Sequence, residues 1–350
     1  MQVRPISITV FTLCAISPIV LLLLAGAWGG GWVWLALLQM ALVPVAFDIL
    51  NPQIAADAPE PAEFPAADAL LVAIGVGHLL ALPLLTFAIA GGSGLAVPQR
   101  VALFVAAGLW FGQVAHPAAH ELIHRSPRRL RALGVAIYTT LMFGHHASAH
   151  RLVHHRAVGT QGDPNTARRG EGYYHYAPRA WVGSFRLGLR AETRRRQGQP
   201  GTLHPYLIYT IGAAASLIAA YLCAAGPGVL VWAGFGLHAT SQILVSDYVQ
   251  HYGLSRHPEP GRNYEPVSAA HSWNAGQWFT TAMMLNAPRH SDHHVHPQRP
   301  YPALQLPDPA VAPRLPWPLP LACLIALYPP YWHRRMAPLM PRQKPPVAGL

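Results

Sequence analysis

Residues 97–124 read VPQRVALFVAAGLWFGQVAHPAAHELIH, an apolar run that ends in two histidines four positions apart. Between 97 and 119 the only charged residue is Arg100, close to the start of the run. A helix of about 20 apolar residues crosses the hydrocarbon core of a bilayer, and this run reaches that length. The stretch therefore predicts a membrane-spanning helix that presents His120 and His124 at one face of the membrane.

Apolar runs of similar length recur along the chain. Charged residues make up 11% of the sequence and hydrophobic residues 52%, whereas soluble domains carry about 25% charged residues. Too little charge remains to cover a soluble surface. The six predicted spans are 6–28, 31–50, 67–90, 97–119, 203–225 and 228–249. We therefore expect an all-α integral membrane protein with a single domain over 1–350.

Arginine is distributed unevenly between the two ends of these spans. The segments 125–131 and 151–196 hold fourteen arginines, whereas the loops 29–30 and 91–99 hold none. Loops rich in arginine stay on the cytoplasmic side of a membrane. This bias explains the net charge of +11 without a nucleic-acid partner. It predicts a bacterial-type inner (plasma) membrane protein with its arginine-rich side in the cytoplasm.

Two shorter or interrupted apolar stretches are not expected to cross. The run 132–144 is too short to span, so we expect a re-entrant or interfacial helix that returns to the side it left. The run 317–332 is broken by four prolines, which favours an interfacial segment within a proline-rich tail over 311–350. Segments 120–202 and 250–310 then form a cytoplasmic cap that contains all the histidine clusters.

Three histidine clusters occur in this cap: HELIH at 120–124, HRLVHH at 150–155 and HSDHH at 290–294. Residues four apart lie on one face of a helix, so such a pair can reach one metal. In the second cluster His150 and His154 form this pair, and the adjacent His155 can turn toward a second metal. With His251 at the end of the sixth span, the candidate metal ligands are His120, His124, His150, His154, His155, His251, His290, His293 and His294.

Nine converging imidazoles exceed the ligand set of one metal. A structural zinc site closes at four ligands and a zinc protease site uses three, whereas two irons with four or five ligands each would use the whole set. Metal-bound histidines usually donate their second ring N–H to a carboxylate or carbonyl, so Asp247, Asp292 and Glu121 are candidates for that contact. HELIH alone also matches the H-E-x-x-H of zinc metalloproteases, with Glu121 as general base, and this alternative stays open.

The remaining histidines considered fall into two groups. His116 and His146 lie one helical turn from His120 and His150, and with neighbouring His145 they are intermediate candidates. Isolated histidines are usually ordinary core or surface residues. We assign that role to His175, His204, His238, His257, His271, His296 and His333.

The chain resembles the membrane-bound alkane monooxygenase family, within the membrane fatty-acid desaturase and hydroxylase superfamily, because it carries HELIH, HRLVHH, HYGL and HSDHH in that order. The likeness covers roughly residues 100–300. It includes Gly162-Asp163-Pro164, the run 167–172 and HSWN at 271–274, and xylene monooxygenases share most of it. The family usually has Glu at the positions of Ala149 and Gln250, where this chain is uncharged.

The resemblance implies that the same nine histidines bind two iron ions in a non-haem di-iron centre. It also implies O2-dependent hydroxylation of a terminal methyl group to a primary alcohol, most of all on a medium-chain n-alkane held in membrane lipid. Electrons would come from a rubredoxin or ferredoxin with its NAD(P)H-dependent reductase. The sequence itself has no C-x-x-C pair and no G-x-G-x-x-G after a predicted strand.

Other functions remain open at this point. The same centre could hydroxylate an aryl methyl group or desaturate an acyl chain. From different classes, an intramembrane zinc metalloprotease would use HELIH alone, and a non-catalytic metal-handling membrane protein would bind metal without consuming O2.

Overall fold

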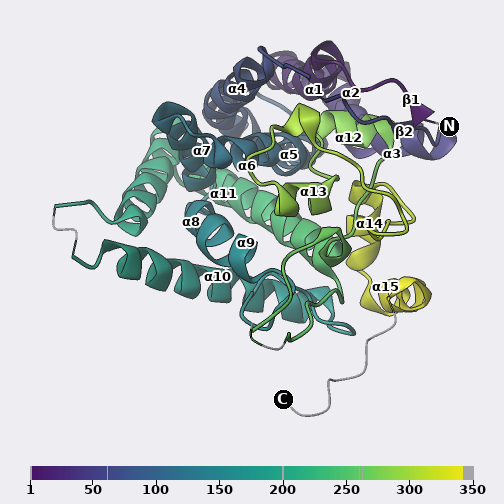
Figure 1. Ribbon diagram of the computed structural model, residues 1–350. Coiled ribbons are helices and arrows are strands. Elements are labelled where there is room, and N and C mark those ends of the chain that lie inside the picture. The colour runs from purple at the N-terminus through teal and green to yellow at the C-terminus, as the bar shows by residue number, and fades with distance from the viewer. Residues whose placement is uncertain (1, 61, 199–200, 260, 262, 342–350) are drawn as a thin grey trace.

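Helices account for nearly all regular structure in the computed structural model, which describes residues 2–60, 62–198, 201–259, 261 and 263–341 (Figure 1). The α-helices are α1 (Ile8–Trp28), α2 (Gly31–Ala41), α3 (Val43–Leu50), α4 (Ala67–Phe87), α5 (Val97–Trp110), α6 (His116–His124), α7 (Arg128–Thr140), α8 (His146–Ala149), α9 (His155–Ala157), α10 (Tyr173–Arg196), α11 (Pro205–His251), α12 (Trp278–Met283), α13 (His290–Val295), α14 (Leu319–Ala326) and α15 (Pro329–Met336). The π-helical turns are η1 (Ala88–Gly92), η2 (Phe111–Ala115) and η3 (His150–His154). The 3₁₀ turns are η4 (Ala269–His271), η5 (Tyr301–Ala303) and η6 (Ala337–Leu339), and β1 (Gln2–Val3) pairs in parallel with β2 (Ile54–Ala55). The end of the expected proline-rich tail, 342–350, lies outside the described residues.

Within the described residues, four helices are long and apolar enough to cross a membrane: α1, α4 with η1, the run from α5 through α6, and α11. A fifth is added if α2 and α3, which meet at 47°, count as one bent span. Pro44, which has no backbone N–H, lies in the first turn of α3 at this bend. The prediction of an all-α chain with several apolar spans is confirmed. The count is below six because predicted spans 203–225 and 228–249 fall within the single element α11.

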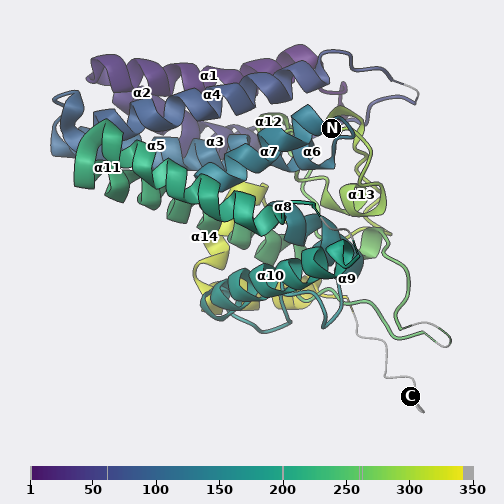
Figure 2. The same ribbon diagram turned by 90° about the vertical axis from the view of Figure 1, so that its left-hand side faces the viewer.

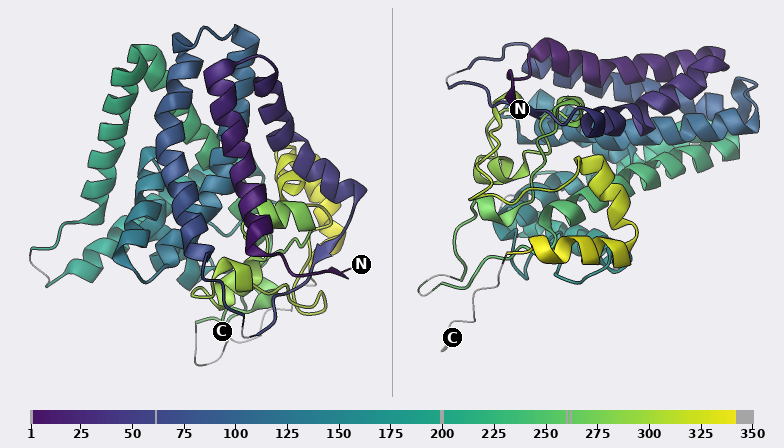
Figure 3. Two further views of the ribbon diagram at one scale, coloured as in Figure 1. Left: turned by 90° about the horizontal axis from the view of Figure 1, so that it is seen from above. Right: turned by 90° about the vertical axis from the view of Figure 1, so that its right-hand side faces the viewer.

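Helix α11 is interrupted near its middle. Its backbone leaves the helical region at Ala224 and Ala225, which divides it into a first arm, 205–223, and a second arm, 226–251. A straight helix of 47 residues would be about 70 Å long, more than twice the thickness of the hydrocarbon core. In the left-hand view of Figure 3 the teal first arm rises at the outer edge of the bundle and the chain turns at its top.

Contacts with α7 show that the two arms fold back on each other. A Cβ atom added to Gly212, in the first arm, would lie 2.3 Å from the Thr139 side chain. Trp232, in the second arm, donates its indole N–H to the carbonyl of Thr140 at 2.8 Å. These two α11 residues would be about 30 Å apart along a straight helix, yet they contact consecutive residues of α7. The bend at 224–225 therefore reverses the chain.

Helix α7 returns along α6. A Cβ atom added to Gly134 of α7 would lie 2.8 Å from the carbonyl oxygen of Ala119. Near the end of α7, the Tyr138 hydroxyl and His116 Nδ1 are hydrogen-bonded at 2.9 Å. The chain then turns at Met142, whose φ is 58°, and leads into α8. This return brings the histidines before and after α7 to one place.

The apolar helices and the histidine-bearing segments occupy different parts of the molecule. Figure 2 shows α1, α2, α4, α5 and α11 running roughly parallel in one block, with α8, α9 and α13 gathered toward one end of it. Helix α10, an amphipathic element that the sequence reading did not single out, lies beneath this block and packs against α8 and α11. Prolines divide the segment 317–332 into α14 and α15, and α14 packs against α11.

The close approach of α6 and α7 predicts that Gly134→Val destabilises the protein. The added side chain would meet backbone as well as Leu122 and Ile123, so α7 must shift at a cost of roughly 1–3 kcal/mol. Gly226→Ala is the control, because nothing lies within 4 Å of a Cβ atom there. The melting temperature in detergent should fall for Gly134→Val only. Equal values for the two variants would contradict the contact.

Candidate metal centre

Four segments bring all nine candidate histidines to one end of the bundle. They come from α6, from the run α8–η3–α9, from the end of α11 and from α13. Their ligand atoms form two groups, and within each group all atoms lie within 4.8 Å of one another. We call these the first imidazole group, His120, His124, His150, His155 and His293, and the second imidazole group, His154, His251, His290 and His294.

The spacing of the ring nitrogens fits metal coordination. In the first group, His150 Nε2 is 2.7 Å from His120 Nε2 and 2.9 Å from His155 Nε2. In the second group, His290 Nε2 is 3.0 Å from His251 Nε2. Two imidazole nitrogens bound at right angles, at about 2.1 Å from a metal, lie about 3.0 Å apart. Each group therefore has the dimensions of one coordination shell.

Hydrogen bonding between the rings does not satisfy these atoms. The Nε2 atoms of His124 and His154 are buried and have no hydrogen-bond partner in the described residues. A neutral imidazole nitrogen is either a donor or an acceptor, so a group of facing nitrogens cannot all be paired with one another. A bound metal would accept every lone pair at once. The donor set thus fits a metal in each group.

Burial keeps many of these imidazoles in the form that metals bind. Burial first, and then neighbouring imidazoles, hold the pKa of His150, His155, His290, His293 and His294 well below its usual value. A histidine must be neutral to offer its lone pair to a metal. These five rings are therefore ready to bind a cation at neutral pH.

A π-helical turn decides how the second cluster is divided. In η3 the backbone N–H of His155 bonds to the carbonyl of His150, a spacing of five residues. This wider turn places His150 and His155 in the first group and sends His154 to the second. The spacing of four had instead suggested that His150 and His154 share a metal. That pairing is wrong, because the helix contains one extra residue in this turn.

The third cluster is also shared between the groups. His290 and His294, one α-helical turn apart, belong to the second group, and His293 belongs to the first. There are therefore two places where neighbouring residues belong to different groups. They are His154 and His155 in η3–α9, and His293 and His294 in α13. The same short stretches of backbone therefore carry ligands of both groups.

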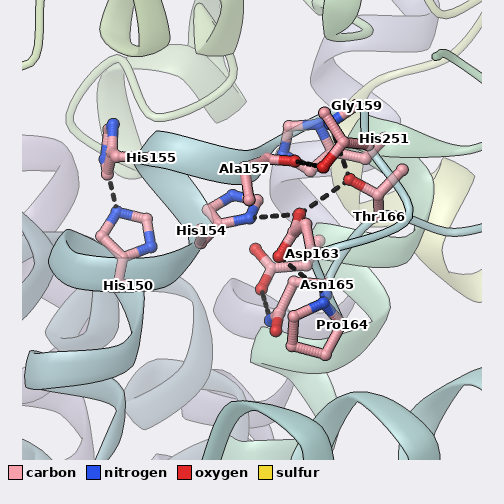
Figure 4. Close-up of polar contacts among 12 residues, drawn as sticks. His150, His154, His155, Ala157, Gly159, Asp163, Pro164, Asn165, Thr166 and His251 are labelled. Atoms are coloured by element: carbon pink, nitrogen blue, oxygen red, sulfur yellow. Dashed lines mark hydrogen bonds and ion pairs between the residues drawn. The ribbon is translucent and has the colours of Figure 1, made fainter. Parts of the chain in front are cut away.

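Asp163 orients one histidine of the second group. Its Oδ2 accepts the Nδ1–H of His154 at 2.8 Å and the Thr166 hydroxyl at 2.7 Å, and its Oδ1 accepts the Asn165 backbone N–H at 3.0 Å (Figure 4). Burial opposes ionisation of Asp163, but His154 and these hydrogen bonds lower its pKa below the usual value. The contact leaves the His154 Nε2 lone pair aimed into the group. From the sequence, Asp163 is identified only within Gly162-Asp163-Pro164, without this contact.

Backbone and amide contacts fix His251 and the start of α13. His251 Nδ1 faces the carbonyl of His271 at 3.3 Å, which leaves Nε2 for the second group. Asn274 Oδ1 accepts the backbone N–H of Ser291 at 3.0 Å in the first turn of α13. His271 and Asn274 are the first and last residues of the HSWN run.

Arg289, the residue before α13, is fully buried and ties this helix to the N-terminal part of the chain. It donates to the carbonyls of Ala55 at 2.7 Å and Leu304 at 2.6 Å, and it pairs with Asp57 at 2.5 Å. Removing such a buried charge from its partners is costly, so Arg289 holds α13 in position.

The three carboxylates predicted near the ligands make other contacts. Glu121 accepts the backbone N–H of Tyr301 at 3.1 Å, and Asp292 accepts that of Gln305 at 2.8 Å. Both acids therefore anchor the segment that follows α13. Among the described residues, neither they nor Asp247 hydrogen-bond any of the nine histidines. Glu121 also pairs with Arg125 at 3.4 Å, so it is not placed as the general base of a zinc protease.

A largely apolar cavity of about 330 Å³ adjoins both groups. His120, His150 and His290 line one part of it, and Leu109, Leu324 and Leu327 line another. The intermediate candidates His116 and His146 are also in its wall, whereas His145 packs beside Phe143 and Trp181. Asp247, which accepts the Asn165 amide N–H at 2.7 Å, and Gln250 add polar groups to the wall.

The sequence profile of the fatty acid desaturase family matches residues 95–323, which contain all nine histidines. The chain belongs to the fatty acid desaturase family. Curated relatives in this family include an alkane 1-monooxygenase of Pseudomonas putida, 32% identical over 249 residues, and one of Acinetobacter baylyi, 30% identical over 227 residues. The alignments cover 69% and 64% of this chain and 60% and 55% of those enzymes.

A second type of relative is a component of an aromatic-hydrocarbon monooxygenase. The hydroxylase component of the xylene/toluene monooxygenase of Pseudomonas putida is 27% identical over 328 residues, which cover 89% of this chain and 83% of that protein. The chain spans 55% to 65% of the length of the first three curated alkane 1-monooxygenases it matches.

The contact between Asp163 and His154 predicts that Asp163→Asn weakens metal retention in this desaturase-family centre. Loss of such an orienting carboxylate typically lowers metal affinity by about 10- to 100-fold. The metal held after dialysis against graded chelator should fall for Asp163→Asn. Asp308→Asn, at an exposed acid whose side chain accepts the Ala310 N–H, should match the wild type. If both variants retain metal equally, Asp163 has no such role.

Proposed function

We propose that this protein is a membrane-embedded non-haem di-iron monooxygenase that uses O2 to hydroxylate a terminal methyl group of a hydrophobic substrate. The observation that carries the proposal is the juxtaposition of the two imidazole groups with a largely apolar cavity. Medium-chain n-alkanes are the first candidate substrates, because several curated relatives are alkane 1-monooxygenases. Aryl methyl groups are the second, because the xylene/toluene monooxygenase component aligns with most of the chain.

The shape of the cavity supports a linear substrate. Leu109 precedes His120 by eleven residues on the continuous run from α5 to α6, a distance of about 16 Å along the helix axis. The cavity therefore extends from the histidines along the apolar helices. An alkyl chain lying in it would place its end beside His120, His150 and His290.

The chain's own residues would bind and orient the substrate. Leu109, Leu324 and Leu327 offer apolar contact, and burial of the alkyl chain against them supplies the binding free energy. Bound iron would supply the O2 activation that an unactivated C–H bond requires. His120, His150 and His290 are buried, so the reacting end of the chain would lie in the part of the cavity farthest from the exposed Leu324 and Leu327.

We further propose six membrane crossings with the histidines facing the cytoplasm. They would be α1, the bent pair α2–α3, α4, the run α5–α6 and the two arms of α11. The fourteen arginines of 125–131 and 151–196 support this orientation. Electrons would come from a rubredoxin or ferredoxin with its NAD(P)H-dependent reductase, and an acidic carrier would be attracted to the arginine-rich side.

Purified full-length protein tests the function directly. Metal analysis should find two irons per chain. With NAD(P)H, reductase and either carrier, the protein should consume O2 and convert an alkane or methylarene into a primary alcohol. One zinc and O2-independent peptide cleavage would instead indicate a metalloprotease. Metal binding without O2 uptake would indicate a metal-handling protein, and formation of double bonds alone would indicate a desaturase.

The cavity predicts that Leu109→Trp shortens the accepted substrate. A larger side chain far from the histidines should reduce turnover of long n-alkanes by on the order of tenfold relative to short ones, because only the long chains reach it. Val101→Trp is the control, since Val101 lies on the same helix but is exposed. Product profiles from a mixture of alkanes measure the effect. An equal loss for all chain lengths would contradict the proposed orientation of the cavity.

A further inference from the structure

A second large space lies away from the metal centre, between α7, η3, the end of α10 and the first arm of α11. This interhelical cleft has a volume of about 1080 Å³. The first arm stands at the outer edge of the bundle, as the left-hand view of Figure 3 shows. Its exposed residues include Leu207, Ile208 and Ile211, so this side of the cleft is suited to contact with membrane lipid.

One face of α7 lines the whole cleft, and its residues change from charged to mainly apolar along the helix. The lining residues of this helix are Arg128, Arg131, Ala132, Val135, Ala136 and Thr139. Their spacing of three and four places them on one side of the helix. The arginines lie at the start and small apolar residues follow. The cleft therefore has a cationic rim and an apolar interior.

The rim carries more positive charge than the protein neutralises. Five arginines and a single carboxylate, Glu192, line the cleft. Glu192 already accepts the Ser148 hydroxyl at 2.6 Å and pairs with Arg196. The side chains of Arg128 and Arg195 have no hydrogen-bond or ion-pair partner among the described residues.

Arg151 adds a further positive charge to this rim. Its side chain lines the cleft and likewise makes no hydrogen bond or ion pair within the described part of the chain. Like charges gathered in this way are stabilised by an added anion.

The depth of the cleft matches one half of a bilayer. It closes where Gly212 of the first arm meets Thr139 of α7, and it opens toward Arg128. Eleven residues of α7 separate the two ends, which corresponds to about 16 Å. The hydrocarbon core of a bilayer is about 30 Å thick, so the whole cleft, with its rim, is about as deep as a single leaflet. Its apolar part, from Ala132 to Thr139, accounts for about 10 Å of that depth.

We propose that this cleft binds one anionic phospholipid, with its phosphate at the arginine rim and an acyl chain along the face of α7. Clusters of basic side chains between membrane helices bind anionic head groups in this way, with about 1 kcal/mol from each Lys or Arg near the surface. The apolar wall formed by Val135, Ala136 and Ile208 holds the chain. The site requires only that the arginine rim lie at a membrane surface. It does not depend on the proposed hydroxylation.

Lipid titration of the full-length protein in neutral detergent tests this site. Phosphatidylglycerol and phosphatidylcholine with identical acyl chains are added separately, and bound lipids are counted by native mass spectrometry. The double variant Arg128→Gln/Arg195→Gln should weaken the first phosphatidylglycerol by roughly 30-fold, from two lost charges. The matched control is Arg129→Gln/Arg194→Gln. It removes two exposed neighbouring arginines that do not line the cleft and should change affinity less than about threefold.

A third variant separates a lipid from a free phosphate. Ile208→Gln removes apolar contact from the wall and should also weaken phosphatidylglycerol, while melting temperatures of all variants remain near the wild type because the changed residues are exposed. Equal losses for both arginine pairs, or equal binding of the two lipids, would overturn the proposal. So would displacement of the lipid by millimolar inorganic phosphate together with full binding by Ile208→Gln, because the site would then recognise phosphate alone.

Discussion

The rest of this structure must hold nine imidazoles together, seven of them buried and two, His124 and His155, partly exposed. Facing ring nitrogens at about 3 Å are poorly satisfied by one another, and an unpaired buried polar group costs roughly 1–3 kcal/mol. The surrounding chain must hold them in place against that cost. Asp163 does so at His154, Arg289 and Asn274 do so at α13, and Glu121 ties α6 to the segment after α13. The metal centre and this frame of buried polar contacts are therefore one unit.

The sequence predicted the apolar helices and the nine histidines because both depend on local periodicity. Runs of apolar residues and the spacing of HELIH are visible without tertiary structure. The division of the histidines into two groups could not be predicted from the sequence. It depends on the extra residue in the π-helical turn η3, and no residue type in this segment marks a π-helix. Contacts between segments far apart in the chain could not be predicted from the sequence at all. Glu121 and Tyr301 are 180 positions apart, and the reversal of α11 becomes evident only from its contacts with α7.

Ala149 and Gln250, where the family resemblance would place Glu, both make close contacts in the structure. Ala149 is buried, and a Cβ atom on Gly188 of α10 would lie 3.2 Å from it, so a small side chain allows α10 to pack closely on α8. Gln250 donates its amide N–H to the carbonyl of Ala287 at 3.2 Å and accepts the Ser246 hydroxyl at 2.9 Å. It therefore contributes to the cavity wall without adding a charge.

The division of consecutive histidines between the two groups has a consequence for assembly. His154 and His155 share a peptide bond but face different groups, and His293 and His294 do the same. An ion that enters one group restricts the backbone that carries ligands for the other. Much of the conformational entropy that the second ion would have to remove is then already lost. In the proposed two-ion centre, the fold would thus lower the entropic cost of binding the second ion once the first is bound.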